Sequence, residues 1–336
     1  MSVKERDVGY DFIRFFAMFL ILIQHFFSSC DSVGFKYSLF LKNIIEHGSV
    51  KFGGVGVALF FMLSGAVLSL SSKNNISIKE FYKKRLLRIE IPQILGFAFA
   101  FGVIFITTNR DIIHNDILGI IISALGLTYT GLPWLDYFHI NTFWVVGEWF
   151  TAVIILLYVL FPLLKYLFDK FCLISTIVIT IIFVLNLKFK ILSAANGWFS
   201  ITNGLMYFWL GCLFNEYKKY LREYIHIYIV LATIIWFANP LGILGHNYLP
   251  CFLFSILLFL ILYDVKISNR FTNFICKYCY EIYLTHHRVY DLLLPVFLCA
   301  WGSVLQLGLA FIFLLAIIFV VSMLLHKMSN FIIKKI

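Results

Sequence analysis

The sequence predicts an all-α fold: a polytopic membrane protein with about ten transmembrane helices. Its 336 residues are 62% hydrophobic and only 13% charged, with 38 phenylalanines, whereas ordinary soluble domains are about 45–50% apolar and about 25% charged. A soluble globule could not cover so much apolar surface. Apolar runs follow one another along the whole chain, separated by short basic clusters. These observations exclude a secreted disulfide scaffold, a disordered chain and an ordinary cytosolic enzyme.

Ten apolar runs approach the length of about 20 residues that one membrane-crossing helix requires. They cover residues 12–28, 53–71, 91–108, 142–164, 171–187, 201–215, 225–240, 249–263, 282–301 and 304–325. An eleventh segment, residues 117–129, is too short to cross comfortably. Because only short loops remain, we expect a single integral-membrane domain over residues 1–336. Arg14, Gln24 and His25 interrupt the first run and no small-residue cleavage site follows it, which favours a membrane helix over a signal peptide.

The basic residues predict which side of the membrane each loop faces. The net charge is +10, and Lys and Arg gather in short clusters. These clusters are Lys4/Arg6, Lys73 to Arg88, Lys165/Lys170, Lys218/Lys219/Arg222, Lys266/Arg270/Lys277 and Lys327/Lys334/Lys335. All of them fall on one side if residues 117–129 do not cross. The positive-inside rule therefore favours ten spans, both termini in the cytoplasm, and a re-entrant or interfacial helix at 117–129. The same rule explains the positive charge without a nucleic-acid partner.

The seven cysteines form neither a disulfide framework nor a metal-site pattern. Five of them lie in or beside apolar runs, where a thiol behaves as a small hydrophobe. Cys276 and Cys279 form one CxxC pair, with no second pair and no histidine at zinc-site spacing. The sequence also contains no nucleotide-binding glycine fingerprint, P-loop or HExxH motif. We therefore expect buried thiols, no metal and no permanently bound cofactor.

Arg14 and His25 are ionisable residues inside the first run. Each such residue costs about 2.5–3.5 kcal/mol on insertion scales, so each needs a reason. Their separation of eleven residues corresponds to about three helical turns and a rise of about 16 Å, so both project from one face of a helix. One helix would then carry a cation near its cytoplasmic end and an imidazole near its outer end. The alternatives are a snorkelling arginine and a histidine that only satisfies a neighbouring polar group.

Glu148 lies in the segment from Phe143 to Phe150, which opens the fourth run near its outer side. It has no cation nearby in the sequence and therefore needs a partner or a wet cavity. On the ten-span topology, Glu148 and His25 lie at similar depth. A carboxylate that orients an imidazole is a general-base arrangement. The sequence permits this pairing without showing it.

Arg85 and Arg88 lie three residues apart, just before Pro92. On a helix they share a face, and paired guanidinium groups suit phosphate oxygens because their donors form a planar fork. A juxtamembrane basic stop or a contact with lipid headgroups explains the same residues equally well.

Two weaker candidate segments remain. Ser64 lies in a stretch whose glycines favour close helix packing. His286 lies with His287 and Arg288 near the start of the ninth run, towards the cytoplasm. His286 could line the same cavity as His25.

Five short segments follow one another in a fixed order. They are Tyr10-Asp11-Phe12-Ile13-Arg14 with Gln24-His25, Phe60 to Gly65, Arg85-Leu86-Leu87-Arg88 with Pro92, Trp144 to Glu148, and Glu281 to His286. They resemble the Arg-x10-His, FFxLSG, RxxR, WxxxE and YxxYLxH-like motifs of the acyltransferase-3 family of bacterial membrane O-acyltransferases. The resemblance spans essentially the whole chain and adds Asp11, Ser64, Trp144 and His286 as candidate site residues. One position departs from the family, since many members carry histidine where this chain has Thr142.

The resemblance implies transfer of an acyl group, usually acetyl, from acyl-CoA to a hydroxyl group. Acceptors in the family are mostly sugars of surface polysaccharides such as exopolysaccharide, capsule or O-antigen, along with peptidoglycan, lipids and small metabolites. The expected partners are acetyl-CoA as donor substrate, a polysaccharide or lipid-linked glycan acceptor, and membrane lipids. The expected location is the bacterial inner membrane. The sequence contains no SGNH-type domain after the last run, so we expect the chain to finish transfer itself or to pass the acyl group to a partner.

The expected mechanism uses Arg14, Arg85 and Arg88 to hold the CoA phosphates. His25 acts as general base on the acceptor or briefly carries the acetyl group, and Glu148 orients His25 or the sugar. Two other classes stay open: a transporter or flippase for a glycan or lipid, and a non-catalytic membrane scaffold. The transporter is less favoured because the two halves of the chain do not match in glycine- or proline-broken helices.

Overall fold

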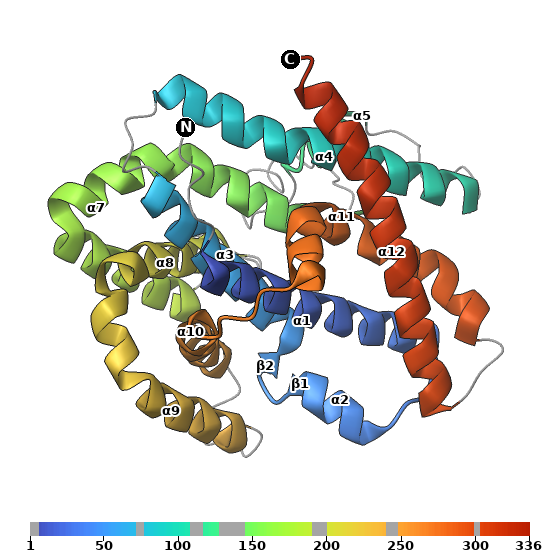
Figure 1. Ribbon diagram of the computed structural model, residues 1–336, viewed down its shortest axis with the longest axis horizontal. Coiled ribbons are helices and arrows are strands. Elements are labelled where there is room, and N and C mark those ends of the chain that lie inside the picture. Colours follow the sequence, from blue (N-terminus) through green and yellow to red (C-terminus); the bar gives the residue numbers. More distant parts are fainter. Residues whose placement is uncertain are drawn as a thin grey trace. The chain divides into compact units, whose positions relative to one another are not determined.

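A computed structural model describes residues 7–71, 77–107, 117–127, 145–189, 200–239, 248–298 and 303–336, and these residues are almost entirely helical (Figure 1). The helices are α1 (Val8–Ser32), α2 (Leu39–Ile45), α3 (Phe52–Ser71), α4 (Ile78–Thr107), α5 (Ile117–Ala124), α7 (Glu148–Phe189), α8 (Ile201–Leu221), α9 (Ile225–Ala238), α10 (Leu249–Tyr263), α11 (Arg270–Leu298) and α12 (Val304–Ile333). A 3-10 turn, η3 (Arg222–Tyr224), joins α8 to α9. One hairpin pairs β1 (Glu46–His47) with β2 (Val50–Lys51) in antiparallel register. The prediction of an all-α fold is confirmed.

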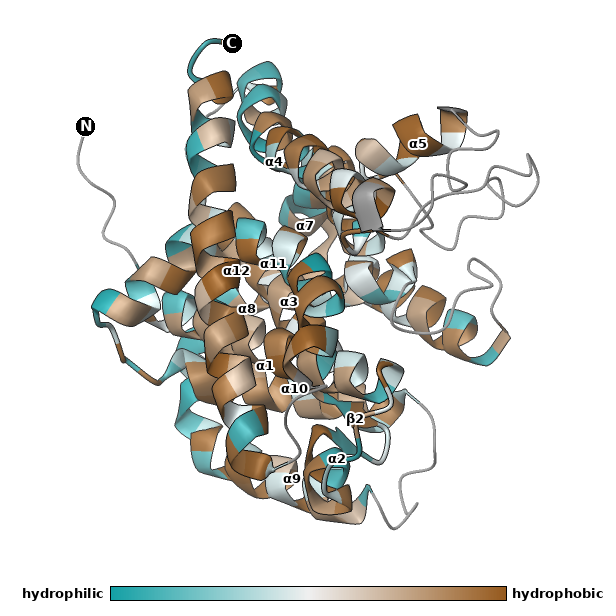
Figure 2. Ribbon diagram, turned by 90° about the vertical axis from the view of Figure 1, so that its right-hand side faces the viewer, coloured by the Kyte–Doolittle hydropathy of each residue, from teal (hydrophilic) through white to brown (hydrophobic). Residues whose placement is uncertain are grey.

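Among the described residues, six stretches of helix are long and apolar enough to cross a membrane, and hydrophobic residues colour much of the helical ribbon in Figure 2. They are Val8–Ser32, Phe52–Ser71, Ile78–Phe105, Glu148–Phe189, Ile201–Ala238 and Val304–Ile333. The longest, α7, loses helical geometry at Phe171, where the sequence predicts that a new run begins. The turn η3 interrupts Ile201–Ala238 in the same way. Helix α5 has only eight residues, fewer than a membrane crossing needs.

The described helices belong to two compact units. The first unit contains Met1–Ser71 and Tyr207–Cys279, and the second contains Ser72–Met206 and Tyr280–Ile336. The unit boundaries fall inside α8 and inside α11. A single domain over residues 1–336 stays a prediction.

In the first unit, α1 packs against α3 and α10, and α10 also packs against α3 and α9. Helices α3 and α8 approach each other closely at two glycines. A Cβ atom at Gly65 would collide with the carbonyl oxygen of Phe208, and one at Gly211 would collide with that of Met62. Small residues at such crossings let two backbones touch, which is how membrane helices associate without a hydrophobic driving force.

In the second unit, α4 packs against α5, α7 and α12. Helix α4 begins at Ile78, well before the apolar run predicted from residue 91, so the basic segment around Arg85 is helical. The part of α11 in this unit contacts α4 where Gly96 faces Leu284. Helix α12 starts with a capping box in which Ser303 and Gln306 bond to each other's backbone N–H groups.

Candidate functional site

Helix α1 carries both Arg14 and His25, as the first apolar run predicts; their position on one face stays a prediction. Nη1 of Arg14 donates to Oδ1 of Asp11 at 2.7 Å, and the two side chains are 26% and 9% exposed. This pair stabilises the buried carboxylate of Asp11 and uses one of the five N–H donors of the guanidinium group. His25 is half-buried, and its neighbour Gln24 donates to Glu46 at 3.1 Å.

The residues around Asp11 dock the start of α1 against α8 and α10. Tyr10 is buried, and its hydroxyl donates to Oδ1 of Asn215 at 2.6 Å. Asp7 caps α1 and accepts a hydrogen bond from the hydroxyl of Tyr263 at 2.8 Å. The thiol of Cys276 donates to the carbonyl oxygen of Asp11 at 3.1 Å, so this cysteine is buried within the packing of the first unit.

Ser64 is half-buried on α3, directly before the glycine of the α3–α8 crossing. The thiol of Cys212 on α8 donates to the carbonyl oxygen of Gly65 at 3.4 Å. Close helix packing therefore accounts for the glycine of this motif. A chemical role for Ser64 stays a prediction.

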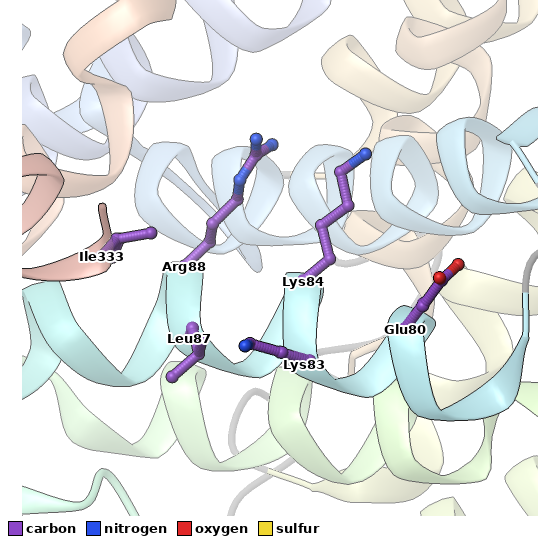
Figure 3. A pocket seen from close by; sticks show the side chains of 6 residues that line it. All are labelled: Glu80, Lys83, Lys84, Leu87, Arg88 and Ile333. Atoms are coloured by element: carbon purple, nitrogen blue, oxygen red, sulfur yellow. The ribbon is translucent and has the colours of Figure 1, made fainter. Parts of the chain in front are cut away.

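The basic segment of α4 opens onto a pocket of about 440 Å³ (Figure 3). Its described lining residues are Glu80, Lys83, Lys84, Leu87, Arg88 and Ile333. Lys84 and Arg88 are exposed and extend to the same side of the helix, as their spacing of four residues requires. Lys84 thus joins Arg88 in the pocket, while the half-buried Arg85 is not among the described lining residues.

Glu148 is the first residue of α7 and is only 1% exposed. Both of its carboxylate oxygens accept the N–H of Val145, at 2.8 and 2.9 Å, and Oε1 also accepts the N–H of Val146 at 3.0 Å. Gly147 makes this turn with φ +80°, a left-handed conformation that favours glycine. The carboxylate therefore folds the preceding segment back onto the start of its own helix, where a negative charge is also favoured by the helix dipole.

Two residues of α11 hold the same turn from the other side. The hydroxyl of Tyr283 donates to the carbonyl oxygen of Gly147 at 2.6 Å, and Nε of Arg288 donates to that of Val145 at 2.8 Å. Arg288 also pairs with Asp291 at 3.3 Å. The turn is thus fixed by Glu148 on one side and by α11 on the other. Trp144, which directly precedes Val145, lies outside the described residues.

His286 is fully buried on α11. Its Nδ1 lies 2.6 Å from the carbonyl oxygen of Tyr283. A carbonyl can only accept, so Nδ1 carries the proton and, in the neutral ring, Nε2 carries the lone pair. The ring also contacts those of His287 and Tyr290. This arrangement fixes one tautomer and one ring orientation, which are the properties a general base requires.

The predicted site residues divide between the two units. The first unit contains Asp11, Arg14, His25 and Ser64, and the second contains Arg85, Arg88, Glu148 and His286. Within the second unit, Tyr283 links the Glu148 turn to His286, because its hydroxyl bonds to the turn and its carbonyl bonds to the imidazole. Pairing of Glu148 with His25 stays a prediction.

A buried polar cluster in the second unit has no signal in the sequence pattern. Gln93 of α4 accepts hydrogen bonds from the hydroxyl groups of Thr151 and Tyr280, at 3.1 and 3.4 Å. Gln93 and Thr151 are both completely buried. Gln93 and Thr151 lie in two different apolar runs and Tyr280 lies just before a third, so only the folded helices reveal that the three belong together. Thr151 could have been suspected, because it lies one turn after Glu148 on the same helix face.

No curated protein and no solved structure matches this chain. A family model described as an acyltransferase domain matches residues 7–327, which include the Arg14–His25 helix, the basic segment of α4, the Glu148 turn and the His286 segment. The match covers nearly the whole chain and agrees with the resemblance found in the motifs. The chain therefore belongs to the acyltransferase-3 family.

Proposed function

We propose that this protein transfers an acetyl group from acetyl-CoA to a hydroxyl group of a cell-surface glycan, such as exopolysaccharide, capsule or O-antigen. The family match over residues 7–327 carries the reaction class. The six apolar helical stretches among the described residues support a site within a membrane. The proposed location is the bacterial inner membrane, where a cytoplasmic donor can reach a site that also serves an outer acceptor.

We further propose ten spans with both termini in the cytoplasm. The interruptions at Phe171 in α7 and at η3 support this topology, because each divides a stretch too long for one crossing. Cysteine-accessibility labelling at Lys218 tests it. Labelling from the cytoplasm alone is expected, and labelling from the outside would contradict it.

In this proposal the donor phosphates bind the basic pocket on α4. Lys83, Lys84 and Arg88 supply three cations against one carboxylate, that of Glu80, and charge-assisted bonds to phosphate are among the strong hydrogen bonds of proteins. Arg85 and Arg14 are proposed as further phosphate ligands. No other bound group is needed, since acetyl-CoA is the second substrate.

The proposed reaction proceeds through His25. The imidazole removes the proton of the acceptor hydroxyl, and the oxygen attacks the thioester carbonyl of acetyl-CoA. The C–S bond then breaks, the new ester forms, and the CoA thiolate takes the proton from His25. In a second route His25 itself first carries the acetyl group. Exchange of labelled CoA into acetyl-CoA without acceptor is expected for the second route only.

Glu148 is proposed to act through the turn that it stabilises. Its carboxylate accepts N–H groups of Val145 and Val146, and this turn follows Trp144, the other motif residue. The proposed consequence is that Glu148 positions the segment carrying Trp144 relative to His286.

Proton NMR of the host's surface polysaccharide, before and after mild base, tests the proposed function. A deletion strain would be complemented with wild type, His25→Ala or His226→Ala at matched membrane levels; His226 is exposed on α9 and serves as the matched control. We expect base-labile O-acetyl signals with wild type and His226→Ala only. Equal signals with His25→Ala would remove His25 from the mechanism. If the deletion strain keeps the same O-acetyl content in its polysaccharide, a glycan acceptor is contradicted. A lipid or small-metabolite acceptor, or the transporter hypothesis, would then be favoured.

A further inference from the structure

Helices α11 and α12 of the second unit are joined by two polar pairs. Nδ1 of His326 lies 2.7 Å from Oε1 of Glu281, and the hydroxyl groups of Thr285 and Ser322 lie 3.0 Å apart. On each helix the two residues are four positions apart and therefore share one face. Glu281, the first residue on α11, pairs with His326, the second on α12, so the two pairs join antiparallel helix segments. We call these four residues the α11–α12 latch.

The hydrogen bonds of the latch run in a fixed direction. The hydroxyl of Thr285 lies 2.9 Å from the carbonyl oxygen of Glu281, which can only accept. Because a hydroxyl has one proton, Thr285 donates to that carbonyl and Ser322 donates to Thr285. Nδ1 of His326 in turn carries the proton that it donates to the carboxylate of Glu281.

Burial makes the latch sensitive to rotation of α11. Glu281 is 5% exposed, and Thr285 and Ser322 are completely buried. A buried carboxylate is costly unless a partner compensates it. Rotation of α11 by one residue, about 100° on a helix, would break both polar pairs together and separate Glu281 from His326. The latch therefore selects one rotational setting of α11.

His286 directly follows Thr285, and its ring orientation depends on the backbone of the same turn. Its Nδ1 is bonded to the carbonyl oxygen of Tyr283, so a rotation of α11 would carry the imidazole with it. The contacts of Tyr283 and Arg288 with the turn before α7 hold this segment from another side. The latch restrains the same segment of α11 from the side of α12.

We propose that the α11–α12 latch is a positioning device for acyl transfer, which holds the ring of His286 in one orientation. His326 is the positioning residue that acts through Glu281. The inference rests on the proposed function and on His286 belonging to its site. In this proposal the four latch residues act through His286.

A double-mutant cycle tests whether the latch exists. The midpoint of thermal unfolding would be measured for the full chain in lipid nanodiscs, as wild type, Glu281→Ala, His326→Ala and the double variant. We expect each single variant to lower the midpoint and the double variant to lower it by less than the sum. Additive effects would overturn the latch. If an alanine variant does not fold, the cycle of Thr285→Val with Ser322→Ala gives the same readout with neutral side chains.

A kinetic comparison tests whether the latch positions His286. Acetyl-CoA turnover would be followed as release of CoA thiol, with the host polysaccharide as acceptor. His326→Ala is expected to lower kcat about tenfold, the effect of roughly 1.4 kcal/mol of lost transition-state stabilisation, while KM for acetyl-CoA changes less than twofold. His326→Gln, which keeps a donor for Glu281, should recover most of kcat. His226→Ala on exposed α9 is the control.

The outcomes separate the two proposals. If the wild type turns over acetyl-CoA and His326→Ala has the same kcat, the positioning role is overturned and the proposed function stays intact. A loss confined to KM would also overturn it, because positioning of a side chain in the reactive site acts on the chemical step. Absence of acetyl-CoA turnover in the wild type would overturn the proposed function, and the positioning role with it.

Discussion

Two buried carboxylates of the family motifs are compensated in different ways. Asp11, in the first unit, is paired with the side chain of Arg14 at 2.7 Å. Glu148, in the second unit, accepts backbone N–H groups of Val145 and Val146. Both residues are buried, with 6% of Asp11 and 1% of Glu148 exposed when the whole residue is counted.

The difference concerns what each carboxylate can do for the reaction. A side-chain partner such as Arg14 can exchange its contact with Asp11 for a contact with a charged substrate. The backbone partners of Glu148 cannot be exchanged without unfolding the turn. We therefore expect Asp11 to position Arg14, the proposed binding residue, and Glu148 to hold the turn before α7 in place.

Glu148→Ala should have the largest effect. It leaves the N–H groups of Val145 and Val146 without their acceptor, and each such buried group costs about 1–3 kcal/mol. Glu148→Gln keeps one acceptor oxygen and should lose roughly half as much stability. Thermal unfolding of both variants in nanodiscs checks this order. Equal midpoints for Glu148→Ala and wild type would show that the carboxylate does not hold the turn.

Gly147→Ala should come next. A Cβ atom there would lie 2.5 Å from the hydroxyl oxygen of Tyr283, and φ is +80°. The left-handed conformation alone costs a non-glycine residue about 1–2 kcal/mol. Tyr283→Phe removes the clashing hydroxyl, so the double variant should unfold above the midpoint that adding the two single effects predicts. Strict additivity would contradict the contact between Gly147 and Tyr283.

Asp11 and Arg14 should show a smaller and reciprocal effect. Arg14→Gln removes the Arg14 cation from the Asp11 carboxylate, and Asp11→Asn removes that carboxylate charge from Arg14. Because the guanidinium side chain is 26% exposed, we expect a coupling of only about 1 kcal/mol in a double-mutant cycle of unfolding. Glu148→Ala should show no such coupling with a second side-chain substitution, because the partners of Glu148 are backbone N–H groups. Zero coupling between Asp11 and Arg14 would remove the contrast between the two carboxylates.

The parts of the fold that depend on local pattern could be predicted from the sequence. The apolar runs identified the helices, because each membrane helix satisfies its own backbone and must present apolar side chains to lipid. The placement of Arg14 and His25 on one helix followed from the apolar run that contains both. The early start of α4 at Ile78 did not follow from hydropathy, since its first turns are basic.

The contacts that define the site could not be predicted in the same way. The partners of Glu148 are backbone N–H groups of a turn with a positive φ, which leave no mark on the residue pattern except Gly147. The latch joins Glu281 to His326 across 45 positions, and pairs so distant are fixed only by helix packing. His326 follows an apolar run and looks like an ordinary residue at a helix end.

Lys84→Gln should have the smallest effect of the series. It removes one of the cations of the α4 pocket and is expected to raise KM for acetyl-CoA about threefold, with a smaller increase at high salt because ions screen exposed charges. Lys170→Gln, at another exposed lysine of the second unit, is the matched control. Equal KM values for both variants would place the donor phosphates elsewhere.

Transfer of labelled acetyl groups tests the proposed acetyl transfer through His25 most directly. Inverted membrane vesicles containing wild type, His25→Ala or His226→Ala would receive acetyl-CoA labelled in the acetyl group, and base-labile label would be measured in the glycan fraction. Acetyl transfer through His25 predicts label with wild type and His226→Ala, and a loss on the order of a hundredfold or more with His25→Ala. Equal labelling by His25→Ala, or no labelling by wild type, would contradict it.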